Sequence, residues 1–182
     1  MNNKGFTLME ILAVLLILAV VVLFALPGIR AMRAEIYHMQ AKSAAVKMVD
    51  ALRSYYQSTK GGVVTGSLTG RGNGNGSVVG ASTGACSSVG ETGIPNAGGA
   101  TATDLAELFA CGYLTVKDFS GLPYTFTSSL AVSNHGNGVI IPNDGVLVRA
   151  IGTAEAGRYS GEGWCVYRDG SAVETNGGAC PA

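Results

Sequence analysis

The sequence predicts an α+β protein in which one long N-terminal α-helix packs on a C-terminal antiparallel β-sheet. The first observation is an apolar run from Phe6 to Leu26, followed by apolar residues every three or four positions up to Tyr56. Both patterns are typical of helix. The second is a series of short strand-like runs beyond residue 120, separated by Asn, Gly, Asp and Pro.

Composition limits the classes of function. The 182 residues suit one domain with an appendage, and a hydrophobic share of 47% excludes disorder of the whole chain. The 12 basic and 12 acidic residues balance, which argues against a nucleic-acid-binding protein. Residues 1–60 carry seven Lys or Arg and three acids, whereas residues 61–182 carry five and nine. Either this division is chance, or a basic rod meets acidic domains in an assembly.

The first predicted helix segment is long enough to enter a membrane. Its 21 residues from Phe6 to Leu26 would span roughly 31 Å as a helix, close to the hydrocarbon thickness of a bilayer. Three interpretations compete: a permanent anchor, a cleaved secretory signal, or a segment that later leaves the membrane. An ordinary signal fits poorly, because the apolar run is too long. Glu10 is its single charge, and a carboxylate there is costly enough to indicate a function, unless it reaches the headgroups.

The residues around Glu10 stand in a specific order. Lys4-Gly5-Phe6-Thr7-Leu8-Met9-Glu10, followed at once by the apolar run, resembles the processing site of type IV pilins and type II secretion pseudopilins. The resemblance covers residues 1–30 closely and residues 31–60 in character. It implies that a membrane prepilin peptidase cuts between Gly5 and Phe6 and methylates the new amine of Phe6. It also implies that Glu10 pairs with the N-terminal ammonium of a neighbouring subunit during assembly.

Pro27 and Gly28 end the apolar run. Proline inside a helix removes a hydrogen bond and clashes with the preceding turn, so a plain anchor would stop here. Pilins carry a proline near this point with helix on both sides, and the helical pattern here resumes immediately. We therefore expect a kink at Pro27 and Gly28.

The second half of the helix is predicted to be amphipathic. The expected apolar stripe, facing the sheet, is Ile29, Met32, Ile36, Met39, Ser43, Val46, Val49, Leu52 and Tyr56. His38 lies off this stripe and is expected on the polar face. Together these features divide the chain into a leader (1–5), a membrane and assembly helix (6–28), an amphipathic helix (29–60), a Gly-rich loop (61–103) and a short helix with an antiparallel sheet (104–182).

The Gly-rich loop starts at Gly61-Gly62, where the helix should end. Thirteen of the 40 residues in 61–100 are glycine, and they lack the pattern of a phosphate-binding loop. Val63-Val64 and Val78-Val79 are candidate edge strands.

The C-terminal domain opens with a short helix over residues 104–111, capped by Thr101 or Thr103 and followed by Gly112. The predicted strands are Tyr124–Thr127, Val139–Ile141, Val146–Ile151, Trp164–Arg168 and Ala172–Glu174. Asp169-Gly170 is typical of a type I′ hairpin turn. The steps Gly112-Tyr113-Leu114 and Gly121-x-Pro-Tyr resemble the globular domain of major pseudopilins and some pilins, although the usual spacing and a preceding tryptophan are absent.

Four cysteines, Cys86, Cys111, Cys165 and Cys180, lie without the close spacing of a zinc site. An exported domain with an even number of cysteines is expected to form disulfides, and three pairings are possible. We prefer Cys165–Cys180, which closes the terminal hairpin, and Cys86–Cys111, which ties the loop to the short helix. Buried free thiols are the alternative. Many pilins carry a comparable C-terminal bond.

No catalytic pattern is present in the sequence, and we expect no enzyme and no cofactor. Some relatives bind calcium, but no such site can be placed on these residues. The resemblance implies the structural subunit of a type IV pilus-like filament. Its expected partners are copies of itself, minor pilins, prepilin peptidase, an inner-membrane assembly platform and, before assembly, membrane lipid; nucleic acid is not expected. The precursor would lie in the inner membrane, and the assembled subunit in an extracellular pilus or, for a secretion pseudopilin, a periplasmic pseudopilus. A single-span anchored binding domain that never polymerises is the alternative of another class.

Overall fold

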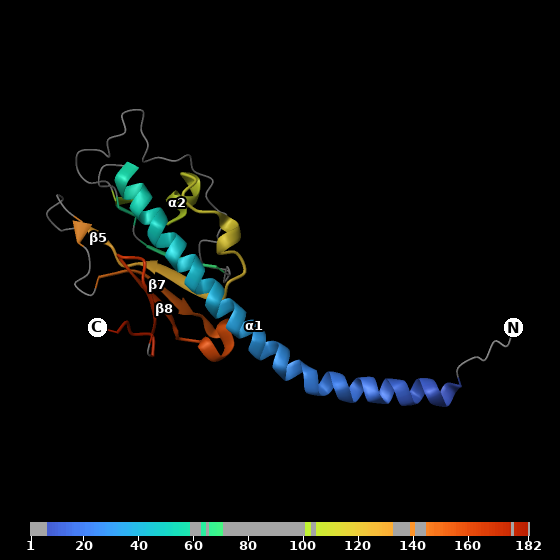
Figure 1. Ribbon diagram of the computed structural model, residues 1–182. Coiled ribbons are helices and arrows are strands. Elements are labelled where there is room, and N and C mark those ends of the chain that lie inside the picture. Colours follow the sequence, from blue (N-terminus) through green and yellow to red (C-terminus); the bar gives the residue numbers. More distant parts are fainter. Residues whose placement is uncertain are drawn as a thin grey trace.

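The structure is a computed structural model, and it describes residues 7–58, 63–64, 66–70, 101–102, 105–132, 139–140, 145–175 and 177–181. Gly5, Phe6, Val78-Val79 and Cys86 lie outside these residues. Within this part of the chain, one long helix lies across one sheet and extends far beyond it (Figure 1). The predicted α+β class is confirmed.

Helix α1 runs without a break from Leu8 to Ser58, a length of about 77 Å for its 51 residues. Its backbone stays helical through Pro27 and Gly28. Figure 1 shows the projecting part of α1 running in a different direction from the part that lies on the sheet. A kink located at Pro27 and Gly28 themselves stays a prediction.

The main sheet has the strand order β2-β4-β7-β8-β9, with every neighbouring pair antiparallel. Its strands are β2 (Gly66–Thr69), β4 (Tyr124–Ser128), β7 (Val146–Gly152), β8 (Gly163–Tyr167) and β9 (Ala172–Glu174). One row across the sheet, Leu68, Phe126, Ala150 and Trp164, is buried. Alternate residues of β4 are buried in the same way, which is the pattern of a sheet with one covered face.

The smaller elements surround this sheet. They are β1 (Val63–Val64), β3 (Thr101–Ala102), α2 (Ala106–Ala110), the 3-10 turns η1 (Val116–Asp118) and η2 (Ala154–Tyr159), β5 (Ala131–Val132) and β6 (Val139–Ile140). The five predicted strands are all present, each within one residue of its expected ends.

The predicted loop 61–103 needs correction, because it contains three strands. Val63–Val64 is a strand as expected, but it pairs in parallel with Thr101–Ala102, so Thr101 belongs to a strand and caps no helix. Gly66–Thr69 is an edge strand of the main sheet. Its residues, Gly-Ser-Leu-Thr, have too little apolar content to indicate a strand.

The hairpin between β8 and β9 is confirmed, but its turn differs from the type I′ expected. Four residues, Arg168 to Ser171, connect the strands; the Tyr167 N–H donates to the Ser171 carbonyl over 2.9 Å, and the Gly170 N–H donates to the Tyr167 carbonyl over 3.0 Å. Gly170 has a φ of 90°, which glycine adopts without strain. Asp169 accepts hydrogen bonds from the backbone and hydroxyl of Ser171, so its carboxylate closes the turn.

The face of α1 that packs on β7 and β8 is not the predicted stripe. Four of the nine residues of the helix that are buried are alanines, Ala41, Ala44, Ala45 and Ala51; the others are His38, Met48, Val49, Leu52 and Tyr55. Of the expected stripe only Val49 and Leu52 are buried and Val46 is partly buried, while Ile29, Met32, Ile36, Met39, Ser43 and Tyr56 are exposed. A pattern search weighted toward large side chains misses an alanine face, although alanines allow a helix and a sheet to approach closely.

Candidate functional site

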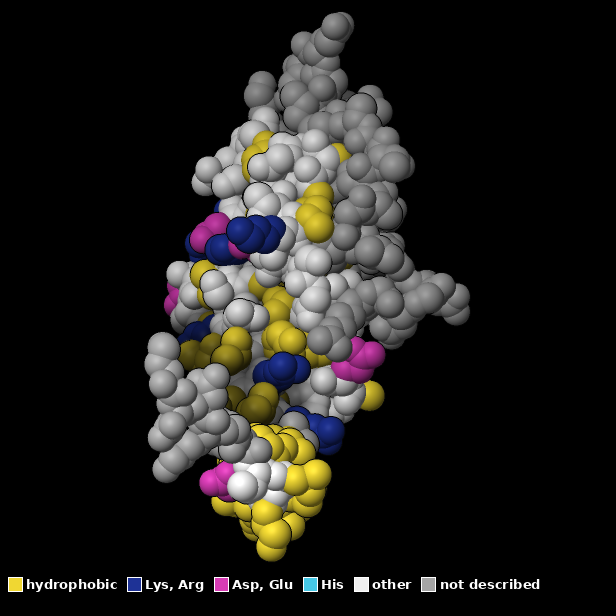
Figure 2. All heavy atoms as spheres, turned by 90° about the vertical axis from the view of Figure 1, so that its right-hand side faces the viewer, with side chains coloured by type: hydrophobic (Ala, Val, Ile, Leu, Met, Phe, Trp, Pro, Cys, Tyr) yellow, Lys and Arg dark blue, Asp and Glu magenta, His cyan; other side chains and the backbone are white. Residues whose placement is uncertain are grey.

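The projecting half of α1 is the most unusual surface of the molecule. Its large apolar side chains from Leu8 to Phe24 are all exposed, with exposed fractions between 47% and 80%. Figure 2 shows hydrophobic side chains covering the end of the molecule where this helix projects. By length and composition α1 is able to cross a membrane, and its most apolar window is not buried at all in the structure. A continuous apolar surface of this size marks a site for lipid or protein contact.

Glu10, near the start of this surface, takes part in the cap of the helix. Its Oε2 accepts the backbone N–H of Thr7 over 2.8 Å and the Thr7 hydroxyl over 3.0 Å. In return, the Thr7 hydroxyl oxygen accepts the Glu10 backbone N–H over 3.3 Å. These reciprocal bonds form a capping box, for which the spacing Thr-x-x-Glu is the sequence signal. Glu10 therefore has a role at the start of the helix besides the one predicted for it in assembly.

His38 is buried, with an exposed fraction of 2%, so its expected place on the polar face is wrong. Its Nδ1 lies 2.9 Å from the Tyr124 hydroxyl and its Nε2 lies 2.9 Å from Glu174. The ring stacks on Tyr159 with centroids 3.9 Å apart, and the Trp164 indole N–H donates to the His38 carbonyl. We call these five residues the His38 cluster. They fix α1 at the point where it leaves the sheet.

Charged side chains surround the His38 cluster. Glu35 accepts a hydrogen bond from the Tyr159 hydroxyl over 2.7 Å and pairs with Arg158. The Tyr159 hydrogen bond, helped by Arg158, lowers the pKa of Glu35. Burial, followed by the charges of Tyr159, Glu162, Glu174 and Glu35, raises the pKa of Tyr124. Tyr124 is therefore a neutral hydrogen-bonding group at any physiological pH.

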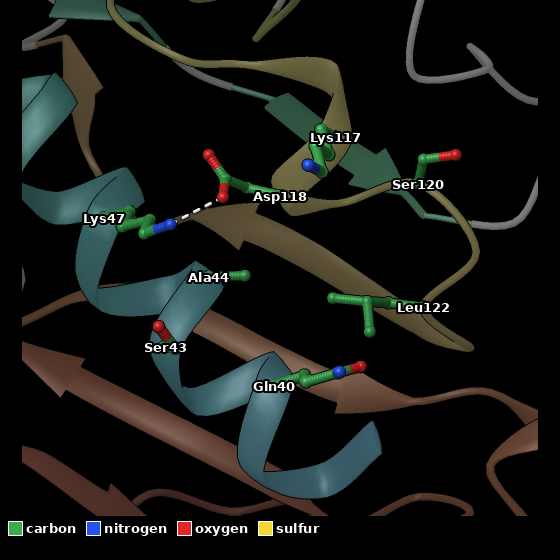
Figure 3. A pocket seen from close by; sticks show the side chains of 8 residues that line it. All are labelled: Gln40, Ser43, Ala44, Lys47, Lys117, Asp118, Ser120 and Leu122. Atoms are coloured by element: carbon green, nitrogen blue, oxygen red, sulfur yellow. Dashed lines mark hydrogen bonds and ion pairs between the residues drawn. The ribbon is translucent and has the colours of Figure 1, made fainter. Parts of the chain in front are cut away.

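A pocket of about 480 Å³ lies beside α1, between that helix and the segment around η1 (Figure 3). Its lining is largely polar: Gln40, Ser43, Ala44, Lys47, Lys117, Asp118, Ser120 and Leu122. Lys47 donates to Asp118 over 2.5 Å, and the Thr115 hydroxyl donates to the other carboxylate oxygen. These two donors, the Lys47 hydrogen bond first, lower the pKa of Asp118. Each oxygen of Asp118 thus already accepts a hydrogen bond, and the two lysines outweigh this carboxylate, so the lining of the pocket carries a net positive charge.

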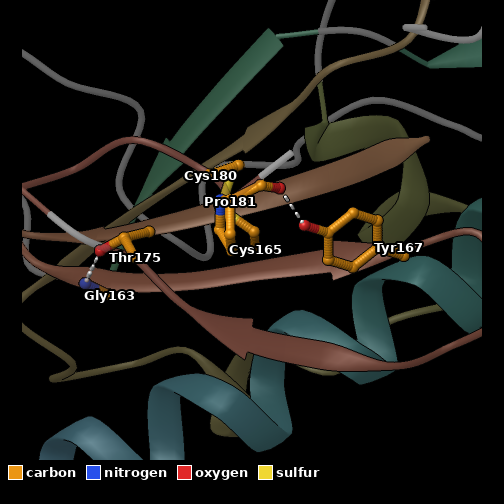
Figure 4. Close-up of a disulfide and its surroundings, with 6 residues drawn as sticks. All are labelled: Gly163, Cys165, Tyr167, Thr175, Cys180 and Pro181. Atoms are coloured by element: carbon orange, nitrogen blue, oxygen red, sulfur yellow. Dashed lines mark hydrogen bonds between the residues drawn. A yellow bond between two sulfur atoms is a disulfide. The ribbon is translucent and has the colours of Figure 1, made fainter. Parts of the chain in front are cut away.

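Cys165 and Cys180 form a disulfide with Cα atoms 5.8 Å apart, the pair that the sequence analysis preferred. It joins buried β8 to the last residues described (Figure 4). Two hydrogen bonds hold the same segment: the Gly163 N–H donates to the Thr175 hydroxyl, and the Tyr167 hydroxyl donates to the Pro181 carbonyl. Cys111 is itself disulfide-bonded, but Cys86 lies outside the described residues, so the Cys86–Cys111 pair stays a prediction.

The predicted site residues therefore lie in separate places. Glu10 is at the far tip of α1, the disulfide is in the sheet, and Gly5 and Phe6 lie outside the described residues. Among the described residues, no group of three or more His, Cys, Asp or Glu side chains is placed to hold a metal ion. The described residues therefore offer three features. They are the exposed apolar half of α1, which we call the rod, the His38 cluster that fixes this helix to the sheet, and the charged side chains around that cluster and around the pocket.

Comparison with known families identifies the tip of the rod. Residues 1–26 match the model of the prokaryotic N-terminal methylation motif. This segment carries the type IV pilin and pseudopilin signature. The match covers the segment from Gly5 to Glu10 and the apolar segment that follows it. No curated protein and no solved structure gives a significant match to the chain.

Proposed function

We propose that this chain is the structural subunit of a type IV pilus-like filament, cut between Gly5 and Phe6 and polymerised through α1. The observation that carries the proposal is the projecting half of α1, whose aliphatic side chains from Leu8 to Phe24 have no partner within the described subunit. Such a rod is stable only in lipid or against other rods. The methylation motif at its tip supports both environments in turn: lipid first, and other helices of the same kind afterwards.

Assembly in this proposal exchanges lipid contacts for helix contacts. The precursor is held in the inner membrane by α1, the peptidase exposes the amine of Phe6, and the helices then bundle with the β-domains outside. Lipid and neighbouring helices are about equally apolar, so the apolar residues alone favour neither state strongly. Polar groups on the rod must then decide which helices meet and at which register.

Glu10 is the residue that we assign to this decision. Its Oε2 holds Thr7, while no hydrogen bond among the described residues uses Oε1. Thr7 remains a peptide unit after the Gly5–Phe6 cut, so the capping box survives processing. Oε1 is then available to the Phe6 ammonium of a neighbouring subunit, which would be largely protonated near neutral pH. In an apolar bundle this pair is favourable only when both charges are present.

A pseudopilin of a type II secretion system is the second candidate. Two short sequence patterns favour it: Gly112-Tyr113-Leu114, and Gly121-x-Pro123-Tyr124, which leads into β4. Both patterns resemble the globular domain of major pseudopilins. The two candidates share the processing site and the assembly helix and differ in the length and location of the filament.

The test separates the two roles of Glu10. Glu10→Gln keeps a side-chain oxygen for Thr7 but removes the charge, whereas Glu10→Val removes both. We expect both variants to be inserted and cut normally but to give over a hundredfold fewer filaments, because the unpaired Phe6 ammonium costs about 3–5 kcal/mol. Val14→Leu, which keeps the apolar surface, is the matched control and should assemble like the wild type.

Two measurements read the result. Mass spectrometry of the membrane fraction shows whether Phe6 is the methylated N-terminus. Immunoblotting of the sheared surface fraction and of the periplasmic fraction measures how much subunit is in filaments and on which side of the outer membrane they lie. Normal filaments from Glu10→Gln would show that Glu10 serves only as a helix cap. A wild-type chain that keeps Met1 beside an active prepilin peptidase would indicate an anchored domain that does not polymerise.

A further inference from the structure

The packed half of α1 has two flanks of different character. Successive helix residues are about 100° apart, so Gln40 and Lys47 emerge on one side of the buried alanine face and Glu35 emerges on the other. The sheet beneath is divided in the same way. Lys117 and Asp118 precede β4, whereas Glu174 ends β9, and β7 and β8 lie between these strands. Three strand spacings separate β4 from β9, on the order of 14 Å.

The first flank, which we call the basic flank, contains the pocket lined by Lys47, Lys117 and Asp118. Lys47 and Asp118 neutralise each other. Lys117 is exposed, and no carboxylate within the described residues lies at ion-pair distance from it. Ser43, Gln40 and Ser120 supply further hydrogen-bonding groups around the pocket. The basic flank therefore has a net charge of +1 and room for a carboxylate side chain.

The second flank, which we call the acidic flank, surrounds the His38 cluster. Glu35 and Glu174 lie there with Arg158 and Lys42, and Glu162, between η2 and β8, is near enough for its charge to act on Tyr124, so these five side chains carry a net charge of −1. The Glu162 backbone bonds to Tyr159 and Gly152, so its position is fixed. Its side chain is exposed, and no cation in the described part of the chain pairs with it.

We propose that the basic flank of one subunit binds the acidic flank of a second copy, with Lys117 paired to Glu162 of that copy. The inference rests on the proposed function and adds the surface through which neighbouring domains meet. The two flanks are different surfaces of one chain, so their contact is heterologous. Repeated heterologous contacts give an open helical filament unless the rotation closes a ring, whereas a self-complementary patch would stop at a dimer.

The opposite charges of the basic and acidic flanks favour a second copy of this chain as the binding partner. Each flank keeps an exposed charge that no ion pair among the described residues neutralises, Lys117 on the basic flank and Glu162 on the acidic flank. On the projecting half of α1 the apolar side chains are alike along its length, so there only the pairing of Glu10 with Phe6 sets a register. A charge pair between domains fixes which subunit follows which, and wrong juxtapositions then bring like charges together.

A charge swap tests this pair in the full chain. We expect Lys117→Glu and Glu162→Lys each to lower the ratio of sheared filament to membrane pool about five- to tenfold, because each variant places like charges at the contact. The double variant Lys117→Glu with Glu162→Lys should return the ratio to within twofold of the wild type. Arg168→Glu, an equal change of charge on the exposed β8–β9 turn, is the matched control and should assemble normally.

Membrane level, cleavage after Gly5 and electrophoretic mobility without reductant show whether each variant is folded and processed. Rescue by the double variant would support the pairing. Single variants that assemble as well as Arg168→Glu, or a double variant that fails like the single ones, would overturn the pairing but leave the proposed function intact. Wild-type chains that are processed and yet form no filament would contradict the proposed function, and the pairing would fail with it.

Discussion

The two halves of α1 are one continuous helix, yet they are built from different residues for different partners. The projecting half presents large aliphatic side chains on every side, and all of them are exposed. The packed half presents alanines with one methionine, one histidine and a few larger residues to the sheet. Small residues occur where a rigid surface must approach closely, and large ones occur where the neighbour is lipid or another rod. Residue size along the helix thus indicates what each segment contacts.

The largest expected difference between the halves concerns methionine. Met48 is fully buried against the sheet, whereas Met32 is 70% exposed. We expect Met48→Ala to lower the free energy of unfolding by about 2–5 kcal/mol, because it leaves a cavity in the core. Met32→Ala should change it by less than about 0.5 kcal/mol.

Urea unfolding of the full chain in mild detergent measures both variants, with the fluorescence of Trp164 as the signal. Trp164 is the single tryptophan, and its indole N–H donates to the His38 carbonyl of α1, so it reports on the contact between helix and sheet. Equal destabilisation by both variants would mean that the two methionines share one environment, contrary to this packing.

The reverse substitution sharpens the comparison. Ala45 is fully buried between α1 and the sheet, whereas Ala13 is exposed in the projecting half. Ala45→Leu should cost about 1–3 kcal/mol through overpacking. Ala13→Leu should leave the domain unchanged, because nothing in the described subunit opposes a larger side chain there. A stable Ala45→Leu variant with unshifted Trp164 fluorescence would show that the helix and sheet are loosely packed.

The same contrast explains how much the sequence could predict. The long helix, the five strands beyond residue 120 and the β8–β9 hairpin follow from apolar spacing and turn residues, which are local signals. The buried face of α1 was predicted wrongly, since alanine is weakly hydrophobic and the larger Ile29, Met32, Ile36 and Met39 dominated the pattern. These four residues are exposed instead, and they lie at the end of the packed half that adjoins the projecting half of α1.

His38 and β2 show the limit of local signals more clearly. The partners of His38 are 86 and 136 residues away in sequence, at Tyr124 and Glu174, so no spacing could indicate its burial. Strand β2 is short and polar, and it is defined by its pairing with β4. At Glu10 the local signal was present in Thr7-x-x-Glu10, but the sequence prediction assigned this carboxylate to assembly alone and left out the cap.

The smallest expected effect comes from the ion pair that ties the packed half of α1 to η1. Lys47 and Thr115 lower the pKa of Asp118 in the folded protein below its unfolded value of about 3.9. This carboxylate therefore stabilises the fold above the unfolded pKa, and the contribution disappears as the pH falls through the folded pKa.

Asp118→Asn should cost at most about 1 kcal/mol at pH 7, because Lys47 is half-exposed. As the pH falls below the unfolded pKa and through the folded one, the urea midpoints of wild type and variant should converge, and a difference that stays constant with pH would assign the effect to the neutral hydrogen bonds of the side chain. Arg53→Gln, which removes the exposed partner of Asp50 on the same helix, is the control and should shift the midpoint less at either pH.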